Sequence, residues 1–137
     1  MNTNETLNSM LVGYIKELQA LVDGDLYYID GDFVVRDMDD ESEEYNQAMD
    51  GETLANFCDW LDSYSLGDLR FEIGADGSFY GAKVLIAYGG PNIWLCDDRI
   101  EGYWGSEEVV IRLPQSVSEI VFDCFREEFD SVKCMWR

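Results

Sequence analysis

Two aromatic-rich apolar runs with a short polar connector between them form the most constraining stretch of this chain, residues 90–105. The connector is Asp97-Asp98-Arg99, and Gly90 and Gly105 stand at the two outer ends. Apolar runs joined by so few polar residues are typical of an antiparallel hairpin. We therefore predict that this hairpin forms the centre of an antiparallel sheet.

Further β-rich runs lie on both sides of this hairpin, at residues 69–73, 79–88 and 109–113. The connectors are short, and parallel pairing needs crossovers of about a dozen residues or more. The pattern therefore predicts a five-stranded antiparallel meander. A second hairpin is predicted from residues 26–29 and 33–35, because Asp30-Gly31 between them is a preferred two-residue turn.

Apolar residues that recur every three or four positions predict two long amphipathic helices, one at each end of the chain. The first begins at residue 3 or 4 and ends before Gly24, where glycine suits a left-handed cap. The last follows Pro114, and Ser116 with Glu119 matches a capping box.

A middle helix is predicted from about Asp50 to the region of Gly67. Trp60 lies toward the flank of its apolar face, so we expect this side chain to be partly exposed. The order of elements predicts a single α+β domain over residues 1–137, with helices covering one face of the sheet. The apolar face of the middle helix comprises Leu54, Phe57, Cys58, Leu61 and Tyr64.

Net charge limits the partners of this chain. It carries 29 acidic and nine basic residues and no His, a formal net charge of −20. Residues 23–68 hold fifteen of the acids against Arg36 alone. Nucleic acids and anionic membranes would repel such a chain, so we expect a basic protein as its partner.

The acidic residues are densest between residues 37 and 52, where no base occurs. Carboxylates on one face would lie about 5–6 Å apart in a helix and about 6.6 Å apart in a strand. Such a row approaches the charge spacing of a nucleic-acid backbone, although a solvated loop that only aids solubility is the alternative. The predicted partner-binding residues are Asp37, Asp39, Asp40, Glu41, Glu43, Glu44, Asp50 and Glu52, joined by Asp97 and Asp98 in the hairpin turn.

Motifs for catalysis are sparse in the sequence. Without His there is no Ser-His or Cys-His pair and no His metal ligand. A calcium loop starting at Asp37 fails, because Ser42 and Ala48 stand where Gly and Glu are needed. We therefore expect a non-enzymatic protein with no cofactor and no metal site. A carboxylate-based hydrolase is a further hypothesis, and it needs a pocketed pair of acids with one raised pKa.

The four cysteines show no C-x-x-C spacing, and three of them fall in apolar patterns. Buried free thiols are therefore expected rather than disulfides or zinc ligands. No window approaches the roughly 18 consecutive apolar residues of a membrane helix, and no basic and apolar leader is seen. We expect a cytoplasmic protein of a bacterial host cell.

The acidic run, the small size, the absence of His and the lack of a catalytic motif together resemble the anti-CRISPR and antirestriction proteins of phages and mobile elements. Several members of that class imitate DNA. Residues 88–94 and 101–105 are also similar to a pattern in uncharacterised small proteins of phages and Gram-positive bacteria, which brings no known activity. The class resemblance implies a basic target, a DNA-binding Cas effector or, alternatively, a restriction-modification enzyme.

An interaction module that docks through exposed aromatic side chains is the alternative function. In that case the acidity serves solubility, and affinity changes little with salt. Most of these rings are expected to be core or cross-strand pairs. The aromatic residues concerned are Tyr27, Tyr28, Tyr80, Tyr88, Trp94, Tyr103, Trp104 and Trp136.

Charge reversal at Asp39, Asp40, Glu43 and Glu44 is expected to abolish partner binding, because it removes half of the predicted row of negative charge. The fold should be unchanged in circular dichroism, since solvated charges are not part of the core. Unchanged inhibition by this variant would exclude mimicry through residues 37–52.

Overall fold

The computed structural model describes residues 3–29, 32–35 and 53–133. In this part of the chain it has three helices and two antiparallel sheets, which confirms the predicted α+β fold. Helix α1 (Thr3–Asp23) is followed by β1 (Leu26–Ile29) and β2 (Asp32–Val35). These two strands pair as predicted, and β3 (Thr53–Leu54) adds a short third strand beside β1. The turn residues Asp30 and Gly31 lie outside the described residues.

The larger sheet is the predicted meander, with the strand order β4-β5-β6-β7-β8. Its central hairpin forms as predicted, with Leu95 paired to Ile100. The connector is one residue shorter than predicted, because Arg99 is already the first residue of β7. Positive φ angles at Gly90 and Gly105, 147° and 61°, explain the glycines at the two outer ends. The strands are β4 (Leu69–Ile73), β5 (Phe79–Ala87), β6 (Asn92–Cys96), β7 (Arg99–Trp104) and β8 (Glu107–Arg112).

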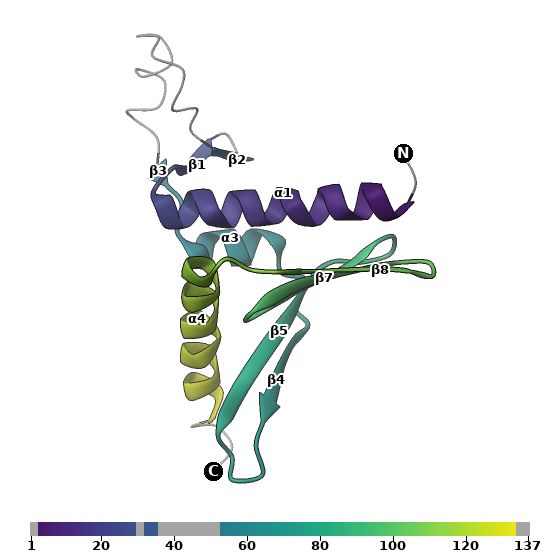
Figure 1. Cartoon of the computed structure of the whole chain (residues 1–137). Coiled ribbons are helices and arrows are strands. Elements are labelled where there is room, and N and C mark those ends of the chain that lie inside the picture. The colour runs from purple at the N-terminus through teal and green to yellow at the C-terminus, as the bar shows by residue number, and fades with distance from the viewer. Residues whose placement is uncertain (1–2, 30–31, 36–52, 134–137) are drawn as a thin grey trace.

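The helices cover one face of this sheet, as predicted. Figure 1 shows α1 lying across β7 and β8, and α4 (Gln115–Lys133) running beside β5. Phe129 of α4 contacts Phe71 of β4 and Phe79 of β5, at ring-centroid distances of 5.6 and 5.3 Å. Helix α4 begins at Gln115, so Ser116 lies in its first turn rather than at the cap that the sequence predicted.

The middle helix differs most from its prediction. It is α3 (Phe57–Tyr64), because the Asn56 side chain accepts a hydrogen bond from the Asp59 amide at 2.8 Å and caps the helix there. Leu54, predicted on its apolar face, instead lies in β3. The residues from Asp50 to Glu52, where the prediction placed its start, lie outside the described residues.

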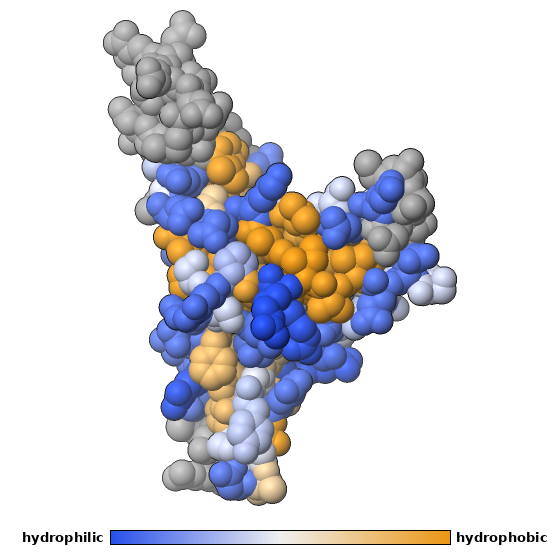
Figure 2. All heavy atoms as spheres, in the orientation of Figure 1, coloured by the Kyte–Doolittle hydropathy of each residue, from blue (hydrophilic) through white to orange (hydrophobic). Residues whose placement is uncertain are grey.

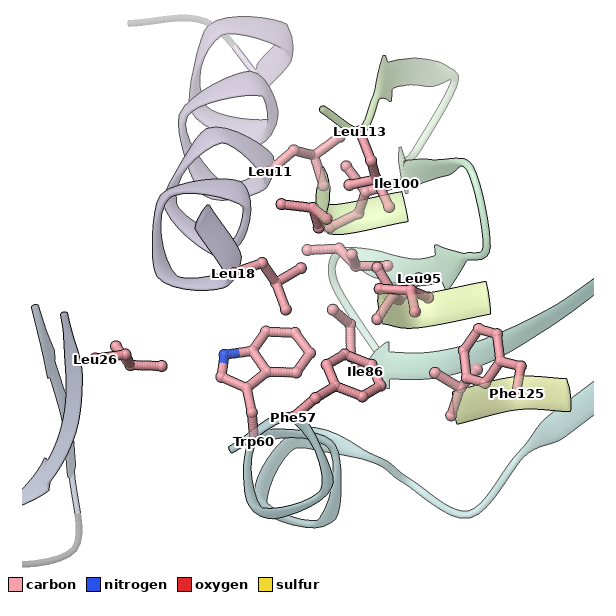
Figure 3. Packing of buried hydrophobic residues seen from close by; sticks show 14 of the residues in the cluster. Leu11, Leu18, Leu26, Phe57, Trp60, Ile86, Leu95, Ile100, Leu113 and Phe125 are labelled. Atoms are coloured by element: carbon pink, nitrogen blue, oxygen red, sulfur yellow. The ribbon is translucent and has the colours of Figure 1, made fainter. Parts of the chain in front are cut away.

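Trp60 is fully buried, so the prediction that it is partly exposed was wrong. Helix α3 packs against α4 and also contacts α1, so the flank of its apolar face is covered as well. The Trp60 ring stacks on Phe57 and meets Tyr14 of α1 edge-on, at centroid distances of 6.1 and 6.2 Å. Figure 3 shows the Trp60 ring below Leu18 of α1 and beside Phe57.

Gly102 sets how closely α1 approaches the sheet. A Cβ atom at this position would lie 2.7 Å from Leu7 Cδ1 and 3.2 Å from Leu11 Cδ2, and both leucines are fully buried. Interiors packed to this density have little room to move aside. A bare glycine in β7 is therefore needed where α1 crosses it.

Two glycine substitutions are expected to change stability in opposite directions. Gly102→Ala should lower the free energy of unfolding by about 1–3 kcal/mol, because it overpacks the contact with Leu7 and Leu11. Gly13→Ala should raise it by about 0.5–1 kcal/mol, because Gly13 is an exposed helix position with nothing within 4 Å of an added Cβ. Urea unfolding of both variants measures the difference, and equal effects would contradict the close approach at Gly102.

Candidate partner-binding surface

Most of the predicted partner-binding residues lie outside the described part of the chain. Only the two acids of the hairpin turn, Asp97 and Asp98, are placed by the structure. The run from 37 to 52 therefore remains a sequence prediction. The residues outside the described ranges are Asp37, Asp39, Asp40, Glu41, Glu43, Glu44, Asp50 and Glu52.

Asp97 has a structural role in the turn between β6 and β7. Its Oδ1 accepts a hydrogen bond from the Ala82 amide at 3.2 Å, and its backbone carbonyl accepts one from the Ser118 hydroxyl at 2.7 Å. A Cβ atom at Gly81 would lie 2.6 Å from the same Oδ1. Asp97 therefore joins β5, the turn and α4, and its carboxylate is engaged within the fold.

Asp98 is exposed and has different partners from Asp97. Its carboxylate pairs with the Arg99 guanidinium at 2.7 Å, and its backbone carbonyl accepts from the Leu113 amide at 3.0 Å. Exposed pairs of this kind contribute about 0–1 kcal/mol, so most of the carboxylate's potential for binding is retained. Of the two turn acids, Asp98 is the one that a partner can contact.

A row of carboxylates that the sequence prediction missed runs along α4. Glu119, Asp123 and Glu127 follow one another at four-residue intervals and are exposed, as is Asp130 further on. Residues spaced in this way share one face of a helix, about 5–6 Å apart. The opposite face carries the buried Val121 and Phe125. The sequence could have shown this row, because its acids occupy the polar positions of the same helix whose apolar stripe was recognised.

Asp98 and the α4 row meet at a hollow of about 680 Å³. Asp98, Glu119 and Asp123 line it together with Arg112 and Phe122. Figure 2 shows hydrophilic side chains over the α4 side of the molecule, with the apolar area displaced toward α1. Tertiary structure thus extends the α4 row to the hairpin turn. We call Asp98, Glu119, Asp123, Glu127 and Asp130 the α4 acidic row.

The α4 acidic row is electrostatically costly for the helix. Like charges at i and i+4 destabilise a helix by about 0.2–0.5 kcal/mol per pair, and acids near its C-terminus oppose the helix dipole. Glu119, Asp123 and Glu127 form no ion pair with any residue that the structure describes. Within the described ranges, no group of acids is gathered tightly enough to hold a metal ion. The carboxylates form an extended line instead, and the exposed Arg126 lies on the same face of α4, between Asp123 and Asp130.

Three basic side chains, from Arg70, Lys83 and Arg99, lie on the face of the sheet that none of the described helices covers. Arg70 and Lys83 lie over the Trp94 ring, at 4.9 and 4.7 Å from its centroid. On the same face the buried Glu101 carboxylate accepts from Arg99 Nε at 2.6 Å and from the Tyr103 hydroxyl at 3.1 Å. Arg70 and Lys83 are therefore occupied with the sheet. Arg99 also pairs with Asp98, so it neutralises the α4 acidic row at that one member.

The cysteines only partly follow the expectation of burial. Cys96 is buried and Cys124 is half-buried, but Cys58 is exposed, and Cys134 lies outside the described residues. Cys58 is exposed because α3 turns it away from the side on which Phe57 and Trp60 are buried. Burial raises the pKa of Cys96 and that of Cys124 to about 12, so both thiols stay protonated at neutral pH.

Comparisons of this chain with known protein families, curated proteins and solved structures find no match. None of the described helices combines the length and the apolar character needed to cross a membrane. The site must therefore be interpreted from its own geometry.

Glu127→Gln is expected to raise the free energy of unfolding by about 0.2–0.5 kcal/mol, because it removes the repulsion from Asp123 one turn earlier. Urea unfolding at low ionic strength measures the gain, which should shrink at high salt. Glu72→Gln on β4 is the control for loss of an exposed carboxylate outside the row, and its effect should be near zero. A loss of stability in Glu127→Gln would contradict the assigned repulsion.

Proposed function

We propose that this protein is a non-enzymatic inhibitor that imitates a nucleic acid and occupies the DNA- or RNA-binding surface of a basic protein. The observation that carries the proposal is the α4 acidic row, an exposed line of carboxylates of which Glu119, Asp123 and Glu127 have no ion-pair partner in the described chain. The sequence carries this row although repulsion between its charges destabilises the helix. A role in binding a basic partner explains why the charges are present.

The dimensions of the row suit this role. Glu119 to Asp130 spans about 16 Å at a rise of 1.5 Å per residue, so four carboxylates occur at about 5 Å intervals. One strand of duplex DNA carries a phosphate every 3.4 Å or so along the axis. A surface of Lys and Arg that binds DNA does so partly because counterions are released from the phosphates. The same surface would bind the α4 acidic row, because its carboxylates also attract cations.

We propose a bacterial defence nuclease as the target, a Cas effector first and a restriction-modification enzyme second. The class resemblance in composition supports this choice, together with a net charge of −20 that disfavours direct binding to nucleic acid. Residues 37–52 carry the same sign of charge and would add to the contact. The protein acts in the host cytoplasm in this proposal.

The second candidate function is an interaction module that docks through aromatic side chains. Tyr80 and Tyr88 favour it, because they are 66% and 76% exposed. Exposed tyrosines are common anchors of protein interfaces. The two functions differ in their response to salt, since contacts between charges weaken with ionic strength and aromatic contacts barely change.

Competition with DNA tests the proposal. Labelled duplex DNA bound to a panel of purified Cas9-type effectors and restriction enzymes is titrated with the full-length protein, and fluorescence anisotropy reports displacement. We expect displacement from at least one enzyme, weakening steeply as salt rises. The double variant Asp123→Asn, Glu127→Gln should displace DNA about fivefold less well, as two surface charges of about 0.5 kcal/mol each imply.

The matched control is Asp62→Asn, Glu72→Gln, which makes the same change in net charge at exposed positions of α3 and β4. It should displace DNA nearly as well as the unmodified protein. Equal losses in the two double variants would show that net charge acts without the α4 acidic row. Failure to displace DNA from any enzyme of the panel would overturn the proposed function.

A further inference from the structure

A small aromatic pocket lies at the end of the sheet opposite to Asp98. It occupies about 290 Å³ between the loop that joins β5 to β6 and the turn that joins β7 to β8. Three rings line it, from Tyr88, Tyr103 and Trp104, together with Asn92 and three loop glycines. Ligand pockets usually measure about 300–1,000 Å³, so this one suits a single side chain.

The walls of the aromatic pocket are held by the fold. The Tyr103 hydroxyl donates to Glu101 Oε1 at 3.1 Å, which orients its ring. Asn92 Oδ1 accepts from the Gly89 amide at 2.9 Å, and Gly89 has a φ of 100°, which favours glycine. The pocket is therefore preorganised, and preorganisation lowers the entropic cost of binding.

The electrostatics of the pocket favour a cation. Within the described residues, none that lines it is Lys or Arg. Glu107 and Glu108 of β8 stand directly opposite Trp104 and Tyr103 in the strand register. Burial, the hydrogen bond to Glu101 and the negative charges of Glu101 and Glu108 raise the pKa of Tyr103 to about 12.

We propose that the aromatic pocket binds an arginine side chain of the basic partner. Guanidinium groups stack on aromatic faces and are less strongly hydrated than ammonium groups, so Arg fits this environment better than Lys. A sugar would need several polar groups, but Asn92 Oδ1 is already used by Gly89. That the arginine comes from a basic partner rests on the proposed function. The preference of the pocket for a guanidinium group does not, because it follows from the residues that line the pocket.

The test uses N-acetyl-L-arginine methylamide as the probe and the full-length protein. Its effect on the indole N–H signal of Trp104 is followed by NMR, with Trp104→Phe used to assign that signal. We expect saturable shifts in the millimolar range, which is typical for one side chain. N-acetyl-norleucine methylamide, the neutral analogue, and methyl glucoside should cause much smaller shifts.

Two variants and one control locate the binding. Tyr88→Leu removes one ring and should weaken probe binding about two- to fivefold, since a cation–π contact contributes about 0.5–1 kcal/mol. Glu108→Gln should weaken it about twofold through the loss of one nearby charge. Tyr80→Leu, which removes an exposed tyrosine outside the pocket, should leave it unchanged.

Stronger shifts with norleucine or glucoside than with the arginine probe, or no shift at all, would overturn this inference. The result is separable from the DNA competition. Probe binding without DNA displacement would support the arginine pocket and contradict the proposed inhibitor function. DNA displacement without probe binding would support the inhibitor function and contradict the arginine pocket.

Discussion

Burial of one face of the meander is the constraint on which the rest of this structure depends. Phe125 and Phe129 of α4 and the leucines of α1 cover that face, and the close contact at Gly102 sets the distance of α1. Because an amphipathic helix has one apolar stripe, this packing turns the opposite stripe of α4 toward solvent. Glu119, Asp123 and Glu127 are therefore exposed as a consequence of hydrophobic burial.

The charges are segregated as well as unbalanced. On the sheet face away from the described helices, Arg70 and Lys83 lie over Trp94. Arg99 pairs there with the buried Glu101, so these cations stabilise the sheet. Glu119, Asp123, Glu127 and Asp130 of the α4 acidic row lie on the side of the sheet that the helices cover, and Arg99 reaches the row at Asp98. A chain with a net charge of −20 thus keeps its sheet intact while presenting one strongly negative side.

The hairpin of β6 and β7 links the two proposed contact regions. Its turn carries Asp98 beside α4, and its other end carries Tyr103 and Trp104 in the aromatic pocket. Five residues of strand separate these ends by about 16 Å. A partner that engages both would combine charge-driven attraction with one oriented side chain, and the second contact adds specificity that charge alone does not supply.

Sequence periodicity assigned Leu54 of β3 to the middle helix and so missed that strand. By itself it nevertheless determined the order of the three helices, the first hairpin and the meander, because amphipathic repeats and connector lengths are local properties. It also located the central hairpin and the long helix that follows Pro114. Other features depended on which elements meet. Trp60 is buried because α1 and α3 close over it, and Asp97 is engaged because α4 places Ser118 beside the turn. The hollow lined by Asp98 and Glu119 brings together residues about twenty positions apart. Only the tertiary fold brings such residues together, because a local pattern carries no information on contacts between distant segments.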